Sequence, residues 1–310
     1  MAERTVHVAR AGLRMKAILI FVDGLGLGVN DPAVNPCLDK NIQLFGYYEQ
    51  GNGVLPAPFH GKMVPTDVCC GVEGIPQSAT GQTTLLTGIN ACQILGMHRK
   101  GFPDATLREI LKTHSILLRL KKAGKKVAFV NAYRPLFFQL KENTKWKLSA
   151  TTVATLSAEL PFFSIEDILH HKALYHDFTN TTLIAQGFEL PLWSPEEAGE
   201  RLAQISQAYD FILYEYFLTD RAGHSQNYPL ALFELIKLEV FVLQLLKSLS
   251  LDQTLVMLTS DHGNIEDLST SNHTRNRVMT FVWGPGSDML SQQIHDLTHI
   301  SPALYRLLCA

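Results

Sequence analysis

The residues of this chain best suited to chemistry are aspartates and histidines that follow apolar runs. Asp261 and His262 stand side by side directly after the apolar run 254–258, and His273 follows eleven residues later. A carboxylate and two imidazoles connected by a short polar loop are typical ligands of zinc or manganese. Because Asp-His-Gly-Asn is also a good turn sequence, a plain turn is the competing interpretation of this stretch.

Two further stretches have the same character. Residues 17–22 form a continuous aliphatic run that is followed by Asp23, and residues 210–217 indicate another apolar strand, which leads to Asp220 and His224. Such runs are typical of strands buried on both faces, which present the residues that follow them at their C-terminal ends. An aspartate and a histidine four residues apart can bind one ion, although a surface turn is the alternative for this pair.

A hydroxyl group completes the set. Ser78 follows Pro76 and precedes a helix-forming run, which places it at or near a helix N-terminus. In that position it is either a simple N-cap or a nucleophile whose ionised form the helix dipole and a metal ion would stabilise. Thr80 is the rival hydroxyl.

Composition limits the classes of function. With 310 residues and a hydrophobic content of 46%, the chain can bury one large domain, or one domain with a small insert. A net charge of −2 predicts no nucleic-acid or anionic-membrane surface. The five cysteines are odd in number and lack CxxC spacing, which favours a reducing cytoplasm over a disulfide framework or a thiolate zinc site. No stretch has the pattern of a signal peptide or a membrane span.

The order of the predicted elements indicates an α/β fold with a doubly wound, mostly parallel sheet and helices on both faces. Strands are predicted at 17–22, 126–131, 210–217, 254–258 and 278–283, and helices from Ser78 and at 104–122, 194–207, 230–251 and 300–308. Ligands of open α/β sheets bind at the carboxyl ends of the strands. We therefore expect Asp23, Asp220 and Asp261 to gather at one edge of the sheet.

A segment in the middle of the chain interrupts this alternation and predicts a small cap inserted into the core. Its three histidines, His170, His171 and His176, are expected at the surface rather than as ligands. The predicted division is an N-terminal tail at 1–14, a core domain at 15–133 and 192–310, and the cap at 134–191.

The candidate ligands suffice for two divalent ions, manganese or zinc. The expected partition is Asp220, His224 and His273 on one ion, and Asp23, Asp261, His262 and the Ser78 oxygen on the other. Two ions roughly 4 Å apart would clamp the attacking and leaving oxygens of an in-line phosphoryl displacement.

The motifs D-G, SxxGQ, DxxGH, DHGN and HTRN, in this order, resemble the alkaline phosphatase superfamily and span about residues 15–308. Within it, the chain is most similar to the branch that contains cofactor-independent phosphoglycerate mutase and phosphopentomutase. The resemblance implies a metal-dependent core, with an alkaline-phosphatase-like fold, that transfers phosphoryl groups. It also favours Ser78 over Thr80, because Ser78 lies ten residues before Gly88, as the family's nucleophile does before its matching glycine.

The activity expected from these features is that of a two-metal phosphoric ester hydrolase or phosphotransferase, which forms a phosphoseryl intermediate and takes a small phosphorylated substrate. A phosphomutase is the first alternative. The mutases insert a large arginine-rich domain between nucleophile and Asp-x-x-x-His, whereas here only residues 79–219 separate Ser78 from Asp220. A catalytically degenerate metal-binding protein is the second alternative. Weaker candidates for substrate binding are Asn90, His98, Asn264 and Arg275.

Overall fold

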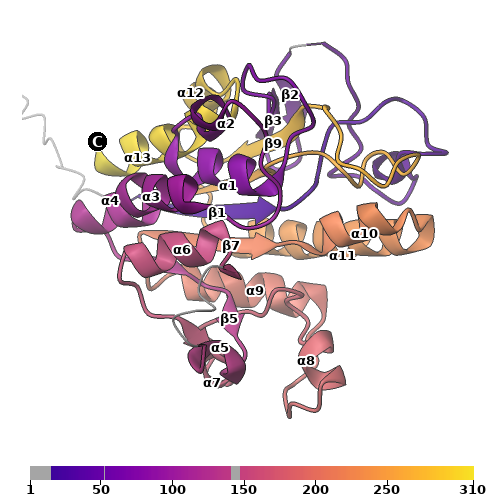
Figure 1. The fold of residues 1–310 in the computed structure, drawn as a ribbon. Helices are drawn as coiled ribbons and strands as arrows, with labels where there is room; N and C mark the ends of the chain where they lie inside the picture. The colour runs from indigo at the N-terminus through magenta and orange to yellow at the C-terminus, as the bar shows by residue number, and fades with distance from the viewer. Residues whose placement is uncertain (1–14, 52, 141–146) are drawn as a thin grey trace, which may run out of the picture.

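The computed structural model describes residues 15–51, 53–140 and 147–310, so the predicted tail at 1–14 lies outside the described residues. Within these ranges, seven strands form one sheet in the order β2-β3-β9-β8-β1-β7-β4 (Figure 1). The strands are β1 (Lys16–Val22), β2 (Leu55–Ala57), β3 (Gly61–Thr66), β4 (Val127–Phe129), β7 (Phe211–Tyr216), β8 (Thr254–Thr259) and β9 (Val278–Trp283).

The centre of the sheet is parallel. β1 pairs with β8 on one side and with β7 on the other, and β4 extends the parallel part beyond β7. Every residue of β7 and β8 is buried, as expected of strands covered on both faces. Because β1, β7 and β8 run in the same direction, their carboxyl ends meet at one edge, which confirms the predicted fold class.

On the side of the sheet beyond β8, the strands are antiparallel, unlike those of a simple alternation of strands and helices. β9 is antiparallel to β8, and β3 is antiparallel to β9. The chain passes from β8 to β9 through residues 260–277 without a crossover helix, and a parallel neighbour would need such a crossover. β2 pairs antiparallel with β3 and lies at the edge of the sheet on this side.

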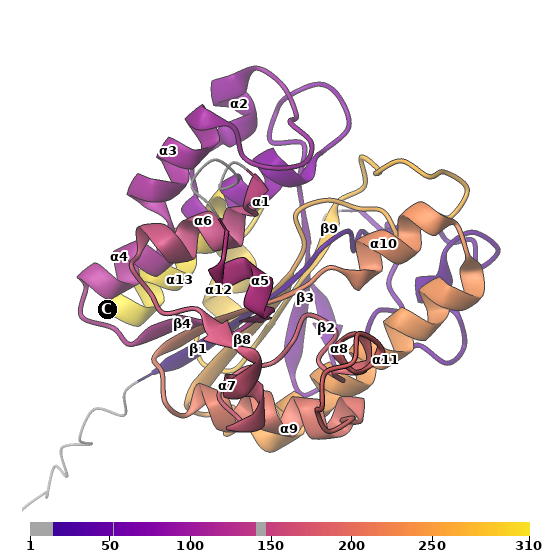
Figure 2. The same cartoon turned by 60° about the horizontal axis from the view of Figure 1, so that its bottom comes forward.

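Helices cover both faces of the sheet (Figure 2). One face carries α1 (Ser78–Thr87), α3 (Ala105–His114), α4 (Ile116–Lys122), α6 (Ala150–Ser157), α12 (Ser287–Gln293) and α13 (Ile300–Cys309). The opposite face carries α9 (Pro195–Ser206) and α11 (Tyr228–Ser248), which pack against each other, with α10 (Leu218–Ser225) beside α11. Of the helices in the described part of the chain, none has the length and apolarity that crossing a bilayer requires.

The single helix predicted at 104–122 is wrong, because the structure divides it into α3 and α4 at Ser115. This residue has ψ 144°, outside the helical region, and its side chain accepts a hydrogen bond from the Leu118 amide as the N-cap of α4. Ser115 is buried, so the kink lies inside the core. The apolar periodicity runs through the kink because Leu111, Ile116 and Leu117 all belong to one hydrophobic cluster.

The predicted cap contains several short elements. These are α5 (Pro135–Phe138), α6, α7 (Ile165–Leu169), α8 (Thr181–Ala185) and strand β6 (Phe163–Ser164), which pairs with β5 (Ala132–Tyr133). α6 packs against α1, α3 and α4, so this part of the segment belongs to the helical layer of the core. The boundaries 134 and 191 remain predictions.

The histidines of the cap do not all lie at the surface. His170 and His171 are exposed, as predicted. His176 is instead partly buried between aromatic rings, and desolvation lowers its pKa to about 4. Because the neighbouring Tyr175 and Phe217 rings pack against it, the surface prediction for His176 is wrong.

Candidate metal centre

The seven predicted ligands come from five places in the chain and meet at the carboxyl edge of the central strands. Asp23 follows β1, and the pair Asp261 and His262 follows β8 after one intervening residue. Asp220 and His224 lie one turn apart on α10. Ser78 is the first residue of α1, and His273 lies in the loop before β9.

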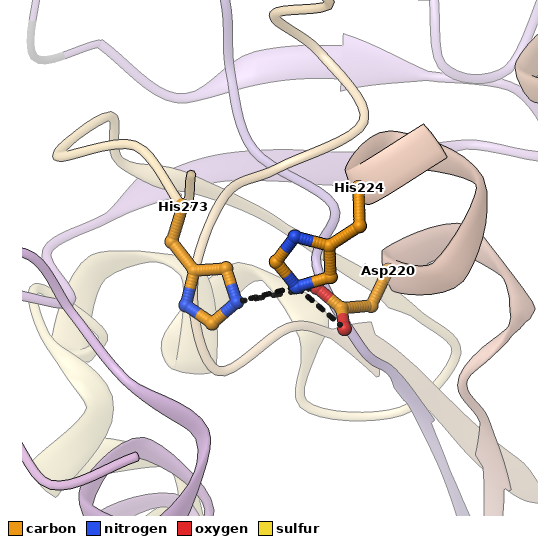
Figure 3. A group of neighbouring side chains, drawn as sticks. All are labelled: Asp220, His224 and His273. Atoms are coloured by element: carbon orange, nitrogen blue, oxygen red, sulfur yellow. Dashed lines mark hydrogen bonds and ion pairs between the residues drawn. The ribbon is translucent and has the colours of Figure 1, made fainter. Parts of the chain in front are cut away.

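One group of ligands consists of Asp220, His224 and His273 (Figure 3). Nε2 of His224 lies 3.4 Å from Oδ2 of Asp220, and Nε2 of His273 lies 3.4 Å from Oδ1 of the same carboxylate. The two Nε2 atoms are 3.2 Å apart. The His224 side chain is 44% exposed, whereas that of His273 is 8% exposed, so this end of the centre faces solvent through His224.

A second group surrounds His262. Its Nε2 atom lies 3.0 Å from Oγ of Ser78, 3.2 Å from Oδ1 of Asp23 and 3.5 Å from Oδ2 of Asp261. Donor atoms of Asp23, Asp220 and His262 also lie within 4.8 Å of one another. Asp220 therefore stands between the two groups, whereas the predicted partition placed it on one ion alone.

The centre gathers negative charge away from water. Asp261 is fully buried, and this burial, followed by the charge of Asp220, raises its pKa to about 7. Burial, followed by the charge of Asp261, raises the pKa of Asp23 well above its usual value. Buried carboxylates that repel one another in this way are stabilised by a bound cation.

His262 provides a neutral ligand atom. Desolvation, helped by the nearby His273, lowers the pKa of His262 to about 3, so its imidazole is neutral at physiological pH. Burial acts to raise the pKa of Asp220, but hydrogen bonding from His273 and the charge of His262 outweigh it, and the pKa falls to about 2. Neutral imidazole and ionised carboxylate are the forms that bind metal ions.

The polar atoms of the centre fit such ions. Within the described residues, Oδ1 of Asp23 and both carboxylate oxygens of Asp261 are buried and accept no hydrogen bond. An unpaired buried polar atom costs free energy, so native structures almost always give it a partner. Oxygen and imidazole nitrogen in this mixture suit manganese or zinc.

Residues outside the predicted set hold the ligand loops in place. The buried Glu266 carboxylate accepts hydrogen bonds from the Gly26 and Asn264 amides and from the Thr274 hydroxyl, which connects the loops after β1 and β8 with the His273 segment. Ser260 accepts a bond from the Leu25 amide and donates one to the His262 carbonyl. Sequence reasoning missed Glu266 because a glutamate in a polar loop is ordinarily solvated.

Close backbone approach at two glycines brings the elements together. A Cβ atom at Gly81 would lie 2.7 Å from the Asp261 carbonyl oxygen, and one at Gly223 would lie 2.5 Å from Oδ1 of Asn264. Only glycine allows α1 and α10 to lie this near the loop after β8. From the SxxGQ motif, Gln82 also reaches the centre and donates a 3.3 Å hydrogen bond to Oδ2 of Asp23.

The weaker candidates for substrate binding have varied surroundings. Asn90 is the N-cap of the short helix α2 (Ala91–Leu95), and the ring nitrogens of His98 lie 3.3 Å from Cys92 Sγ and 3.2 Å from the Val72 carbonyl. Asn264 is buried and donates a 2.7 Å hydrogen bond to Oδ1 of Asp220, which orients that carboxylate. Arg275 is exposed. A substrate contact by any of the four remains a prediction.

A stability measurement tests the repulsion in this centre. Asp261→Asn should raise the free energy of unfolding of the metal-free protein at pH 8 by about 1–3 kcal/mol, because a buried, unpaired charge is removed. The folded-state pKa of Asp261, about 7, lies above its unfolded value, so the carboxylate destabilises the fold increasingly as pH rises toward 7. Denaturant titrations in EDTA should show a smaller gain at pH 5 than at pH 8, and a loss at pH 8 would contradict the assigned repulsion.

Solved structures with similar folds extend over nearly the whole chain. A protein from Pyrococcus horikoshii superposes with a TM-score of 0.56 and 13% identity, over 96% of this chain and 97% of the other. Alkaline phosphatase from the Antarctic bacterium TAB5 superposes with a TM-score of 0.54 and 16% identity, over 94% of this chain and 98% of the phosphatase chain. At such identities the likeness establishes the fold.

Curated relatives match a shorter part of the chain. The 2,3-bisphosphoglycerate-independent phosphoglycerate mutase of Sulfurimonas denitrificans is 28% identical over 127 residues, which are 39% of this chain and 26% of the mutase. That of Wolinella succinogenes is 27% identical over 121 residues, 37% of this chain and 24% of the mutase. The match therefore spans about a quarter of the length of these relatives.

A family model covers almost all of the described chain. The model of the metalloenzyme superfamily matches residues 15–308, which include all seven residues of the centre. The match agrees with a sheet of alkaline-phosphatase-like topology and with buried carboxylates grouped beside histidines. On the strength of that match, this chain belongs to the metalloenzyme superfamily.

Proposed function

We propose that the protein is a two-metal-dependent phosphoric ester hydrolase or phosphotransferase that acts through a phosphoserine intermediate on Ser78. The observation that carries this proposal is the position of the Ser78 hydroxyl. It is half-buried at the start of α1, with Oγ 3.0 Å from Nε2 of His262 among the buried carboxylates. A hydroxyl placed within a set of metal ligands can serve as a nucleophile.

Two divalent ions, manganese or zinc, would be held by the two groups of ligands, with Asp220 beside both. When bound, they would supply positive charge that lowers the pKa of the Ser78 hydroxyl and stabilises the transferring phosphoryl group. The buried, unpaired oxygens of Asp23 and Asp261 support this assignment.

The N-terminus of α1 would add a second electrostatic contribution. No side chain caps this helix through Gln77, and the Thr80 amide donates to the Arg99 carbonyl, so the Ser78 and Ala79 amides are the ones placed for an anion beside Ser78. A ten-residue helix directs the positive end of its dipole toward that anion. The positive potential at this helix end would therefore stabilise both the ionised Ser78 oxygen and the phosphoryl oxygens.

The reaction proposed has two steps. Oγ of Ser78 attacks phosphorus, the bond from phosphorus to the ester oxygen breaks, and the alcohol leaves after taking up a proton. Water then attacks the phosphoserine, and the bond between phosphorus and Oγ breaks. Phosphate is released and the serine hydroxyl is regenerated. In a phosphotransferase, a second alcohol takes the place of water.

A phosphomutase is the second candidate, because the curated relatives that match this chain are phosphoglycerate mutases. A mutase must hold its dephosphorylated intermediate against water, which favours arginines that bind the substrate bidentately. Residues 134–191 contain one arginine, Arg134, whose Nη1 donates a 2.8 Å hydrogen bond to Gln186 at an exposed position. This composition favours water as the acceptor.

We therefore expect manganese-loaded enzyme to release inorganic phosphate from phosphomonoesters, or a monoester from diesters, with little positional isomerisation. The measurement is phosphorus NMR of reactions with 3-phosphoglycerate and ribose 1-phosphate, alongside a panel of other mono- and diesters. Efficient conversion to the isomer without free phosphate would establish the mutase. Protein that retains two ions but turns over no ester would instead be a degenerate metal-binding relative.

A further inference from the structure

A cavity of about 390 Å³ lies at the carboxyl ends of β4 and β7, on the same sheet edge as the metal centre. Six of its lining residues carry aromatic rings, and they are Phe129, Tyr133, Phe137, Tyr175, His176 and Phe217. This volume lies in the range of pockets that bind small molecules. None of these rings has a role in the reaction described above.

The cavity adjoins the metal centre through the pairing of β1 with β7. Tyr216 pairs with Val22, and the Asp23 amide donates a 2.8 Å hydrogen bond to the Tyr216 carbonyl. The residue that follows Tyr216 is Phe217, which lines the cavity. The residue that follows Val22 is Asp23, a candidate metal ligand. Neighbouring strands are about 4.8 Å apart, so a molecule bound through its phosphate at the centre has the cavity beside it.

The aromatic walls offer faces for a flat ring. The His176 ring lies over Phe217 with centroids 4.4 Å apart and an interplanar angle of 30°, and Tyr175 lies 4.1 Å from His176. Two other rings of the wall, those of Tyr133 and Phe137, have centroids 4.1 Å apart. Planar ligands bind such surfaces by stacking, with little dependence on their exact chemistry.

Among the polar groups in the wall, which also include Arg134, two could accept hydrogen bonds from a ligand. Glu215 accepts a 2.6 Å bond from the Thr151 hydroxyl through Oε2, which leaves the other carboxylate oxygen for a ligand in the cavity. Within the described residues, Nδ1 of His176 is buried without a hydrogen-bond partner.

We propose that this cavity, which we call the aromatic pocket, binds the alcohol part of the substrate, and that this part contains a planar nitrogen heterocycle with N–H donors, as in a purine 5′-nucleotide. The inference rests on the proposed function, since the phosphate of the same molecule would lie at the metal centre. The ring would stack between the aromatic walls, and its N–H groups would donate to Glu215.

Guanosine 5′-monophosphate and ribose 5-phosphate provide a direct comparison, because the same ester bond is broken in both and only the base differs. We expect kcat/KM to be about tenfold or more higher for the nucleotide, as for one stacked base. Phe137→Ala, which removes one wall, should reduce this ratio several-fold. Phe138→Ala is the matched control, since Phe138 lies on the same helix, is 52% exposed and does not line the pocket, so its ratio should equal that of the wild type.

The outcomes separate the pocket from the proposed function. Equal kcat/KM values for the two substrates, unchanged by Phe137→Ala, would overturn the pocket while retaining the phosphotransfer reaction. If neither compound is turned over, the test is whether guanosine alone binds. Calorimetry at guanosine concentrations up to about 1 mM, the upper range of ordinary KM values, measures this binding. Binding that Phe137→Ala weakens and Phe138→Ala does not would support the pocket, and absence of binding would overturn it.

Discussion

Replacing Ser78 by alanine is expected to reduce kcat for phosphoester turnover by at least about 10³-fold, since a nucleophile cannot be replaced by its neighbours. The fold should survive, because Ser78 is the half-buried first residue of α1 and, in the described part of the chain, its hydroxyl pairs with His262 of the centre. Rapid-quench experiments with ³²P-labelled substrate should label the wild-type chain and leave the Ser78→Ala chain unlabelled.

Thr80→Ala is the control for this prediction. The Thr80 hydroxyl is completely buried, donates to the Gln77 carbonyl at 3.1 Å and accepts from the Arg99 amide at 3.2 Å. Thr80→Ala should lower the free energy of unfolding by about 1–2 kcal/mol, while the turnover stays within a few-fold of the wild-type value. An active Ser78→Ala enzyme together with an inactive Thr80→Ala enzyme would show that the wrong hydroxyl has been assigned.

Loss of metal ions is the second large effect expected. Protein loaded with manganese or zinc should hold two ions per chain, and His224→Ala and Asp261→Ala should each retain about one. The reason is that His224 lies at the exposed end of the centre, with Asp220 and His273, while Asp261 lies in the buried group with His262. Elemental analysis after gel filtration measures the stoichiometry, with denaturation curves to verify folding.

Asp220 should behave differently from the other ligands. Its carboxylate lies within 4.8 Å of donor atoms in both groups, so Asp220→Asn should weaken both ions rather than one. Asp267→Asn is a suitable control, because among the described residues the Asp267 carboxylate accepts its hydrogen bonds within its own turn, from Ser269. Wild-type protein that keeps no more than traces of transition metal after loading would contradict the assignment of the centre.

The sequence was sufficient to predict which residues meet. Continuous apolar runs before Asp23, Asp220 and Asp261 predicted buried strands, and parallel strands place their carboxyl ends at one edge whatever their order in the sheet. The start of α1 at Ser78 and the capping box of Ser194 with Glu197 in α9 were also predictable, because both depend on residues a few positions apart.

Other features of the structure depend on packing between segments that are distant in the sequence. The kink at Ser115 depends on how α3 and α4 lie against the sheet, and the apolar period is the same with or without it. The antiparallel direction of β9 depends on its partner β8, which the alternation of strand residues does not reveal. The burial of Glu266 depends on three loops that close around one carboxylate.

Motif order and residue type thus determined that a set of hard oxygen and imidazole donors would gather at the sheet edge. Only the tertiary structure decided that Asp220 stands between two groups, that Ser78 reaches His262, and that an aromatic cavity adjoins Asp23. The physical reason is one of scale. Spacing along the chain determines which edge a residue reaches, whereas sharing an ion requires donor atoms placed within a few ångströms, and the contacts between helices, strands and loops far apart in sequence set those positions.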